Sequence, residues 1–443
     1  MTRCTIALVV AVACQFNPAP GIAADRPLPR VPDGYTIERV AGPPLVEHPV
    51  MAGFDDRGRL FVADNAGLNL NKAELEKQTP SMVRVLEDTD GDGTFDKSTV
   101  FADNMTFPQG ALWHDGALYV ASPPGIWRLE DTDDDGRADK RTMLVRGFDY
   151  TGNAADVHGP FLHPSGRLFF CHGRKGHEVY DATGKLVRKG KAAAIWSMNA
   201  DGTDVEIHAT GGMDNPVELV FTPDGGSIGT VNVFHNKTHG DCLVHWVYGG
   251  VYPREDFVDR LSHEFIRTGP LLPEIHNFGH VAVSGLCRYR SEHFGPNPAE
   301  GPNPKPTDPH ILFVTQFNTH KVVRVEMQRH GSTYRVDRSD DFLTTDDPDC
   351  HPTDVLEDAD GSLLIIDTGG WFRIGCPVSQ VAKPDVKGAI YRVRKVGGKA
   401  YDDPRGAMVN WKRATDDVLV EALNDQRVAV RDRAVNTLSR RLA

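Results

Sequence analysis

The chain has 443 residues, of which 40% are hydrophobic and 25% are charged, values that are ordinary for a globular protein. Its 61 acidic and 49 basic residues give a formal net charge of −12, which argues against a nucleic-acid-binding footprint. With 43 glycines and 30 prolines, the chain is expected to turn often.

The first residues are typical of an export signal. Arg3 supplies a positive charge, residues 6–14 form an apolar run, and Ala23-Ala24 offers small residues for cleavage before Asp25. We therefore expect a signal peptide over residues 1–24 and a periplasmic or extracellular protein. No later run is long enough to span a bilayer, so no transmembrane segment is expected in the mature chain. A buried strand and a lipoprotein anchor at Cys14 are the alternatives.

The cysteine spacing gives no metal or haem motif. Five cysteines follow the expected signal, and none stands in CxxC or CxxCH spacing, so neither a zinc site nor a covalent haem is predicted in this chain. Export would permit disulfides, and the pairs closest in sequence are Cys350 with Cys376 and Cys242 with Cys287. The connectivity stays open.

A short pattern recurs along the chain. It has an apolar pair, a turn with Asp or Gly, then Gly-x-Leu and an alternating apolar strand, which is typical of a half-buried β-hairpin. Clear copies occupy residues 53–64, 111–122, 161–173, 219–232 and 354–367, and a weaker copy without the turn glycine occupies 310–327.

These repeats predict an all-β fold, a six-bladed β-propeller over residues 30–397. Repeats of roughly 40 to 60 residues that hold only short strands fit propeller blades, whereas a β-sandwich has no reason to repeat one turn motif. Residues 388–396 are expected to form a closing outer strand. Residues 233–308 are interpreted as a long insertion, and the Pro- and Gly-rich stretch 295–309 as an exposed loop.

The tail has a different character. Residues 415–443 predict a short helical hairpin that resembles the start of a HEAT repeat, with Asp416 as a helix cap. The apolar positions with helical spacing are Leu419, Leu423, Val430, Ala434, Val435 and Leu438. A single repeat cannot bury its own apolar face, so the hairpin must either continue or dock on the propeller.

Two acidic loops, 88-DTDGDGTFD-96 and 131-DTDDDGRAD-139, predict calcium sites. Carboxylates at loop positions 1, 3, 5 and 9 with glycine at position 6 follow the spacing of EF-hand loops. The position-12 glutamate is missing and strands flank both loops, so we expect structural calcium-binding hairpin loops; solvated acidic turns are the alternative. The predicted ligands are Asp88, Asp90, Asp92, Asp96, Asp131, Asp133, Asp135 and Asp139.

Chemistry is expected where the blade loops converge on the propeller axis. His158 precedes a predicted inner strand and is the candidate general base, with Asp156 to orient it. A structural histidine is the alternative interpretation. Other polar residues near predicted inner-strand ends are Asn215, His235, Asn236, His276, His280, Asn318, Lys321 and His351.

Several segments carry a family resemblance. The Gly-x-Leu blades, 158-HGPFLHPSGRLFF-170, 214-DNPVELVFTPDG-225 and 388-GAIYRV-393 resemble the glucose/sorbosone dehydrogenase propellers. The layout over about residues 30 to 440 is similar to that of planctomycete "membrane-bound dehydrogenase" proteins, which join such a propeller with DTDGDG loops to HEAT repeats and a c-type haem domain.

The resemblance implies a quinoprotein that oxidises a sugar or a related alcohol or aldehyde, with pyrroloquinoline quinone at the axis and a cytochrome c-type protein as a possible electron acceptor. His158 matches the family's base and Asn215 a cofactor contact. Where those dehydrogenases usually carry Arg-Asn-Pro, this chain has Asp214-Asn215-Pro216, and an aspartate should repel an anionic cofactor. Lys321, Arg324 or Arg373 are then the candidates for the missing positive charge.

Two other function classes remain open. One is a non-enzymatic propeller that binds a carbohydrate or a protein. The other is a gluconolactonase-type hydrolase with a catalytic divalent metal at the axis, for which Glu218, Asn215 and Asp354 are conceivable ligands.

Overall fold

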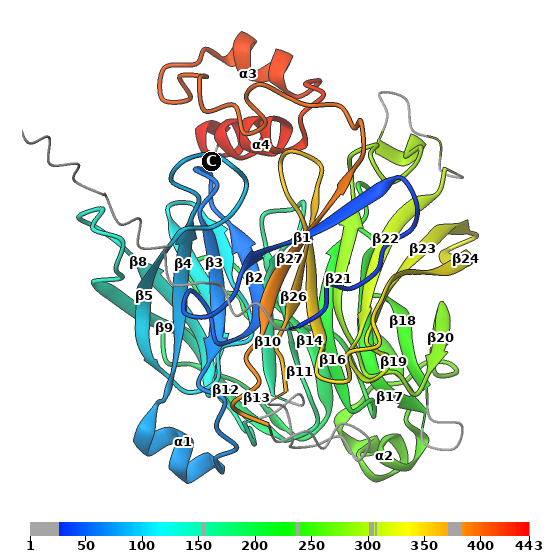
Figure 1. The fold of residues 1–443 in the computed structure, drawn as a ribbon. Coiled ribbons are helices and arrows are strands. Elements are labelled where there is room, and N and C mark those ends of the chain that lie inside the picture. Colours follow the sequence, from blue (N-terminus) through cyan, green and yellow to red (C-terminus); the bar gives the residue numbers. More distant parts are fainter. Residues whose placement is uncertain are drawn as a thin grey trace, which may run out of the picture.

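The fold is seen in a computed structural model that describes residues 26–442 except 153–155, 236–239, 301–304, 306–307 and 371–382. The predicted export signal, Asn236, Arg373 and Cys376 lie outside the described residues. The described part is a ring of six antiparallel sheets with a helical hairpin above one end (Figure 1). The sequence prediction of a six-bladed propeller is therefore confirmed.

The first three blades follow one another along the chain, each given from its innermost strand outward. Blade one has β2 (His48–Phe54), β3 (Leu60–Asn65), β4 (Ser81–Glu87) and β5 (Lys97–Met105). Blade two has β6 (Leu112–His114), β7 (Ala117–Ser122), β8 (Gly125–Glu130), β9 (Lys140–Phe148), β12 (His177–Tyr180) and β13 (Leu186–Gly190). Blade three has β10 (Val157–Leu162), β11 (Leu168–His172), β14 (Ala193–Met198), β15 (Glu206–Gly211) and β19 (Gly250–Tyr252).

The last three blades complete the ring. Blade four has β16 (Asn215–Phe221), β17 (Ser227–His235), β18 (Gly240–Trp246) and β20 (His276–Gly279). Blade five has β21 (Val283–Tyr289), β22 (His310–Gln316), β23 (Lys321–His330) and β24 (Thr333–Thr344). Blade six has β25 (Pro352–Glu357), β26 (Leu363–Asp367), β27 (Ala389–Lys395) and, outermost, β1 (Tyr35–Ala41).

The ring is closed by the N-terminal strand. β1 pairs antiparallel with β27, from Tyr35 opposite Lys395 to Ala41 opposite Ile390. The sequence prediction placed the closing outer strand at residues 388–396, but β27 is the third strand of blade six and β1 lies outside it. Backbone hydrogen bonds between the two ends of the ring thus hold blade six together.

A separate apolar cluster fills each interface between neighbouring blades, so that six clusters surround the axis. Strand alternation explains how one strand serves two interfaces. Phe170 packs toward blade two against Phe148, whereas its neighbour Phe169 packs toward blade four against Phe221. Burying a side chain of this size contributes about 1.5–3 kcal/mol, so the interfaces dominate the stability of the ring.

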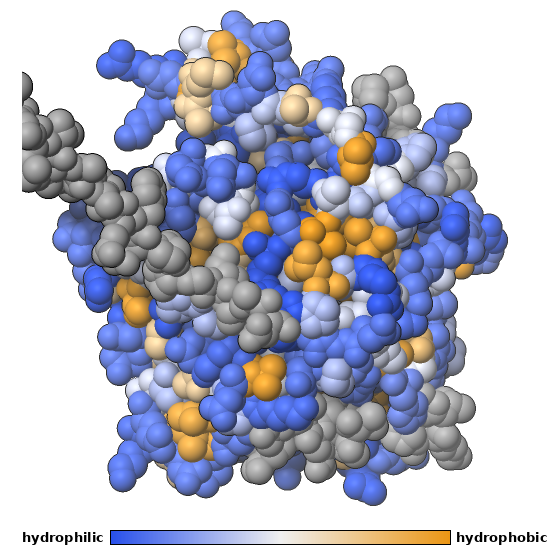
Figure 2. All heavy atoms as spheres, in the orientation of Figure 1, coloured by the Kyte–Doolittle hydropathy of each residue, from blue (hydrophilic) through white to orange (hydrophobic). Residues whose placement is uncertain are grey.

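Short helices connect or follow several of the strands. α1 (Lys72–Gln78) joins β3 to β4, α2 (Glu255–Arg260) and the 3₁₀ turn Ser262–Glu264 follow β19, and two further 3₁₀ turns occupy Pro298–Glu300 and Phe317–Thr319. Among the described helices none is long and apolar enough to cross a membrane. Figure 2 shows a mainly hydrophilic face with an apolar patch near its centre.

The predicted helical hairpin is formed by α3 (Asp416–Ala422) and α4 (Val428–Leu442). Trp411, Leu419, Val430 and Ala434 make a small core of their own, whereas Val435, expected in that core, is 47% exposed. The N-cap is Thr415, whose hydroxyl accepts a hydrogen bond from the Val418 N–H, and not Asp416, which pairs with Arg441. The relation to HEAT repeats stays a prediction.

The prediction that residues 233–308 form an insertion is wrong for most of this segment. Residues 240–289 supply β18, β19, β20 and β21, including the innermost strand of blade five. The Pro- and Gly-rich stretch 295–309 lies between β21 and β22, where the other blades have a tight turn. The four described cysteines, Cys171, Cys242, Cys287 and Cys350, are buried and free, so Cys242 and Cys287 form no disulfide. The pairing of Cys350 with Cys376 involves a residue outside the described ones.

Candidate functional site

The two ends of the propeller axis differ. The helical hairpin lies over the end at which the inner strands finish, where Arg440 pairs with Asp115 at 2.9 Å and Asp432 pairs with Arg290 at 2.7 Å (Figure 1). The opposite end, where the inner strands begin, holds His158 and Asn215. Of the two arrangements expected for the hairpin, these ion pairs show the docked one.

His158 and Asn215 form the centre of the candidate site. His158 lies on β10 and Asn215 begins β16, and both are buried. The His158 Nε2 atom is 3.1 Å from the Asn215 Oδ1 atom. The Asn215 Nδ2 atom is buried and has no hydrogen-bond partner among the described residues. A buried amide donor without a partner is costly unless a ligand or water meets it.

Asp156, predicted to orient His158, holds the backbone of the preceding turn. Its carboxylate accepts hydrogen bonds from the backbone N–H groups of Thr151 at 2.8 Å and Gly152 at 2.7 Å. These bonds fix the turn that leads into β10. The side chain that contacts the His158 Nε2 atom belongs to Asn215, which lies on the next blade along the ring.

Two arginines that sequence reasoning missed lie beside Asn215. Asp214, the residue expected to repel an anion, forms ion pairs with Arg174 and, at 3.3 Å, with Arg254. Both guanidinium groups lie over the ring of Phe257, at 4.6 and 4.7 Å from its centre. Burial and the neighbouring Arg254 lower the pKa of Arg174. Asp256 also pairs with Arg254, at 3.3 Å, so two carboxylates balance the two guanidinium groups, and a third guanidinium, that of Arg260, lies over the same Phe257 ring at 5.5 Å.

The cations that sequence reasoning proposed are placed elsewhere. Lys321 pairs with Asp341 at 2.6 Å, and Arg324 pairs with Glu326 at 2.5 Å and donates to the Phe294 carbonyl. Both lie on β23, the third strand of blade five. No local sequence pattern identifies Arg174 and Arg254 as a pair, because they are 80 positions apart and are brought together only by the propeller fold.

Two of the other predicted polar residues, His351 and His235, have structural partners. His351 lies within hydrogen-bond distance of the Gly369 carbonyl, with 2.7 Å between its Nδ1 and that oxygen, and its ring stacks on Phe317. His235 lies between Glu255 and Glu274 at 3.3 and 3.1 Å. His276 is on the edge strand β20. These positions do not add groups to the His158–Asn215 pair.

A carboxyl pair lies deeper on the inner strands. Glu218 of β16 accepts a hydrogen bond from the Leu286 N–H at 2.9 Å, and Asp354 of β25 accepts one from the Ala52 N–H at 2.9 Å. Burial raises the pKa of Glu218 well above its usual range, and the nearby Asp354 raises it further. Burial also raises the pKa of Asp354, to about 6. Two buried carboxyl groups in contact share one proton unless a cation replaces it.

The two predicted calcium loops gather their carboxylates. Oxygens of Asp88, Asp90 and Asp96 lie within 4.8 Å of one another, as do those of Asp131, Asp133 and Asp135. Asp92 accepts a hydrogen bond from the Thr94 N–H, and Asp139 one from the Thr132 hydroxyl. Asp134 of the second loop pairs with Arg57 at 2.8 Å.

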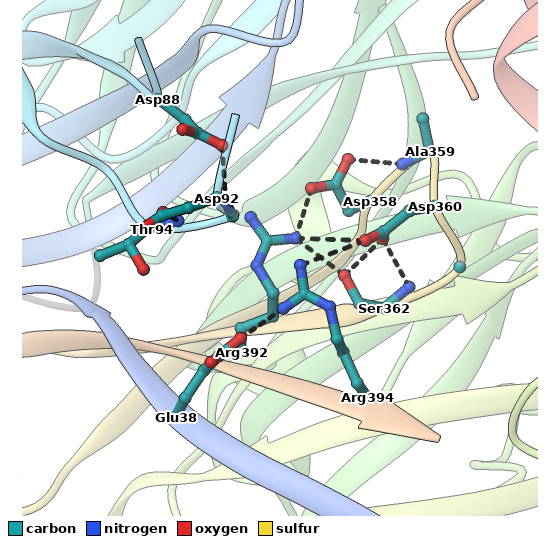
Figure 3. A network of polar contacts seen from close by, with 12 residues as sticks. Glu38, Asp88, Asp92, Thr94, Asp358, Ala359, Asp360, Ser362, Arg392 and Arg394 are labelled. Atoms are coloured by element: carbon teal, nitrogen blue, oxygen red, sulfur yellow. Dashed lines mark hydrogen bonds and ion pairs between the residues drawn. The ribbon is translucent and has the colours of Figure 1, made fainter. Parts of the chain in front are cut away.

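In a third acidic turn, 358-DADGS-362, the repulsion between neighbouring carboxylates is offset by ion pairs. Arg392 pairs with Asp358 at 2.6 Å and Arg394 with Asp360 at 3.4 Å (Figure 3). Arg405 also pairs with Asp358. Arginines from β27 and from the following segment therefore neutralise this turn. Among the described residues, no lysine or arginine pairs with Asp88, Asp90 or Asp96, so the first loop lacks such compensation.

Comparison with known proteins adds a family. The model of a domain of unknown function, DUF7133, matches residues 28–395. The chain belongs to this family. No curated protein matches it. The DUF7133 match ends with β27, so the helical hairpin lies beyond it.

Solved structures share the fold of this DUF7133 protein. An oxidoreductase (glucose dehydrogenase) from a Thermus species aligns with a TM-score of 0.54 at 16% identity, over 81% of this chain and 100% of that one. A Trichoderma reesei protein of carbohydrate-active enzyme family AA12 aligns with a TM-score of 0.55 at 14% identity, over 85% and 100%. At these identities the likeness confirms a glucose-dehydrogenase-like propeller fold and nothing finer.

Proposed function

We propose that this DUF7133 protein is a sugar-related propeller oxidoreductase that works at the His158–Asn215 end of the axis with a quinone cofactor. The observation that carries the proposal is the buried His158 Nε2–Asn215 Oδ1 contact at 3.1 Å, next to the unpartnered Asn215 Nδ2. The likeness of the fold to glucose-dehydrogenase propellers favours the same substrate class.

The residues present fit an anionic, carbonyl-bearing cofactor such as pyrroloquinoline quinone. The Asn215 Nδ2 offers a buried donor, and Arg174 and Arg254 place two guanidinium groups beside it, both paired with Asp214. When bound, the quinone would supply a hydride acceptor.

The protein's own part is proton transfer and positioning. The Asn215 Oδ1 atom holds the ring orientation by accepting a hydrogen bond from the His158 Nε2–H group, and the imidazole would accept the proton of a sugar hydroxyl at its unprotonated ring nitrogen. Arg174 and Arg254 would orient the anionic groups of the ligand, with Phe257 holding both guanidinium planes. Asp156 keeps the turn before β10 in place.

The test is a titration of pyrroloquinoline quinone into residues 25–443 with calcium present, followed by an aldose panel and an artificial electron acceptor. We expect stoichiometric uptake and sugar-dependent dye reduction. His158→Ala should lower kcat by about 10²–10⁴-fold, the usual contribution of a general base. The matched control is His163→Ala, a histidine at the other end of the same hairpin. Absence of uptake at micromolar quinone would overturn the proposal.

A second candidate function is a metal-dependent hydrolase, favoured by the Glu218–Asp354 pair. A divalent cation could replace the shared proton, with Asn215 as a further ligand, and polarise a lactone carbonyl. Calorimetric binding of Ca²⁺ or Mn²⁺ that is lost in Glu218→Gln, together with lactone hydrolysis, would favour it. Dye reduction that is unaffected by Glu218→Gln would favour the oxidoreductase.

We further propose that the loops 88–96 and 131–139 bind structural calcium. We also propose that the chain is exported to the periplasm or cell exterior. A cytochrome c-type protein would take the electrons released by sugar oxidation. The gathered carboxylates support the first of these. Residues 1–24 support the second through their sequence.

A further inference from the structure

A cavity with a volume of about 950 Å³ lies beside blade two, and neither His158 nor Asn215 lines it. Its walls come from the strands β9, β12 and β13, from Lys72 of α1, and from the turn that follows α2. These elements meet near the lower end of the molecule, where Figure 1 shows α1 and α2. A volume of this size is typical of small-molecule sites, which span roughly 300–1,000 Å³.

His177 is the most unusual group in the cavity wall. The side chain is 6% exposed, and neither ring nitrogen has a hydrogen-bond partner among the described residues. Its ring packs edge-on against Trp196, with 5.1 Å between ring centres. The Nε2 atom faces Gly190, which lines the same cavity: a Cβ at Gly190 would lie 3.1 Å from it. Buried polar atoms without partners are rare in proteins, and such a group at a cavity wall points to a ligand.

Among the described residues, the charged side chains that line the cavity without an ion-pair partner are mainly positive. Lys72 is paired with Asp149 at 2.6 Å, and Lys189 with Glu178 at 2.5 Å. Within the described part of the chain, Lys175 and Lys191 have no ion-pair partner, although both line the cavity.

Glu264 and Arg188 complete the set of charged groups. The Glu264 carboxylate is held by the backbone N–H groups of Lys191 at 2.9 Å and Ala192 at 3.1 Å. Arg188 donates to the Glu264 backbone carbonyl at 2.7 Å, which leaves its charge uncompensated by any carboxylate recorded in the described residues. Three cations therefore face one carboxylate that backbone donors already satisfy.

We propose that this cavity binds a small hydroxylated molecule through one anionic oxygen group, a phosphate or a carboxylate, held by Lys175, Lys191 and Arg188 with His177 as a further hydrogen-bonding partner. The apolar part of the wall, formed by Pro124, Phe148 and Leu261, would contact the carbon skeleton. The inference goes beyond the proposed oxidoreductase and stands whether or not quinone binds near His158.

The test is calorimetric titration of the full chain with inorganic phosphate, glucose 6-phosphate, D-glucuronate and, as a neutral control, glucose. Binding of either phosphate compound would identify a phosphate site, and binding of glucuronate alone a carboxylate site; both support the proposal. Glucose binding as tightly as the anions, or no binding by any of them, would overturn it.

Two variants locate the binding. In Lys175→Gln/Lys191→Gln, affinity should fall by about tenfold or more, since two charge-assisted contacts are lost. His177→Phe should also weaken binding, because it keeps the ring packing on Trp196 and removes both nitrogens. Should His177→Phe fail to fold, the lysine variant decides alone, as both lysines lie on the surface of the cavity.

The matched control is Lys185→Gln, on the same β12–β13 hairpin but outside the cavity wall. Its affinity should equal that of the wild type. Undiminished binding by the double lysine variant, or an equal loss in Lys185→Gln, would show binding elsewhere on the surface and would overturn the assignment.

Discussion

The residue that departs most from the resembled dehydrogenases, Asp214, is a counter-ion in this structure. It lies between Arg174 and Arg254, so its negative charge is compensated by two guanidinium groups. The sequence predicted a local repulsion of an anionic cofactor, but it could not show the two paired arginines, because both reach the site from other segments. The contact between His158 and Asn215 was unforeseen for the same reason, since the two residues come from different blades.

This arrangement predicts opposite effects for two substitutions. Arg174→Gln should weaken quinone binding by about tenfold, the loss of one charge-assisted contact. Asp214→Asn should strengthen it, because the amide keeps the shape and removes the charge that competes with the ligand. Fluorescence titration of quinone at low ionic strength measures both. Equal weakening by the two variants would contradict the compensation argument.

The Glu218–Asp354 pair predicts a pH-dependent stability. Both pKa values are raised in the folded state, so the folded protein keeps protons that the unfolded chain has released above about pH 4. Since the unfolded state then binds fewer protons, stability must fall as pH rises from about 4 through the folded pKa values, by about 1.4 kcal/mol per pH unit for each retained proton.

Glu218→Gln should therefore be more stable than the wild type at pH 7.5 and nearly equal to it at pH 4, since the amide mimics the protonated acid and can still accept from the Leu286 N–H. Urea unfolding at the two pH values without added divalent cation measures the difference. The control Glu421→Gln, on the exposed side of α3, should show no such pH dependence. A constant offset between Glu218→Gln and wild type would argue against a shared proton.

Among the elements, the blades could be predicted because their hairpins repeat a turn motif that depends on local chemistry. Gly58, Gly116, Gly166 and Gly361 all have positive φ at these turns, which explains why the glycine recurs. Blade five was misread because residues 290–309 replace its first turn, so the weak copy at 310–327 falls on β22 and β23. No local rule marks such a replacement.

The loop 88–96 predicts calcium-dependent stability. If the Kd for calcium is about one hundredth of the applied calcium concentration, binding should add about 2.7 kcal/mol to the free energy of unfolding. Asp90→Asn should lose most of this gain while changing little in its absence, because the Asp90 carboxylate accepts only one recorded hydrogen bond within the described residues, from the Asp92 N–H at 3.2 Å.

Thermal unfolding with calcium and with chelator measures both effects. Asp134→Asn is the matched control, since Asp134 is paired with Arg57 and is outside the gathered carboxylates. An unchanged melting temperature on chelation of the wild type would leave these loops as solvated acidic turns.

For the whole molecule, the closure by β1 and the docking of the helical hairpin are two different kinds of long-range contact. β1 supplies a full ladder to β27 and buries Val40 and Ala41 in the interface with blade one. The hairpin has a separate small core, and its recorded ties to the ring within the described residues include ion pairs that are partly exposed. Exposed ion pairs contribute about 0–1 kcal/mol each, far less than a buried strand.

Two truncations should therefore have unequal effects. Removal of residues 398–443 should leave a propeller that unfolds cooperatively, with a loss of a few kcal/mol at most, because Asp358 keeps Arg392 when Arg405 is gone. Removal of residues 26–41 should prevent folding, since it opens blade six and exposes the apolar interface with blade one. Far-ultraviolet circular dichroism with urea titration distinguishes the outcomes. A stable ring without β1, or an unfolded one without the hairpin, would mean that the end of the axis covered by α4 contributes more to stability than the strand closure.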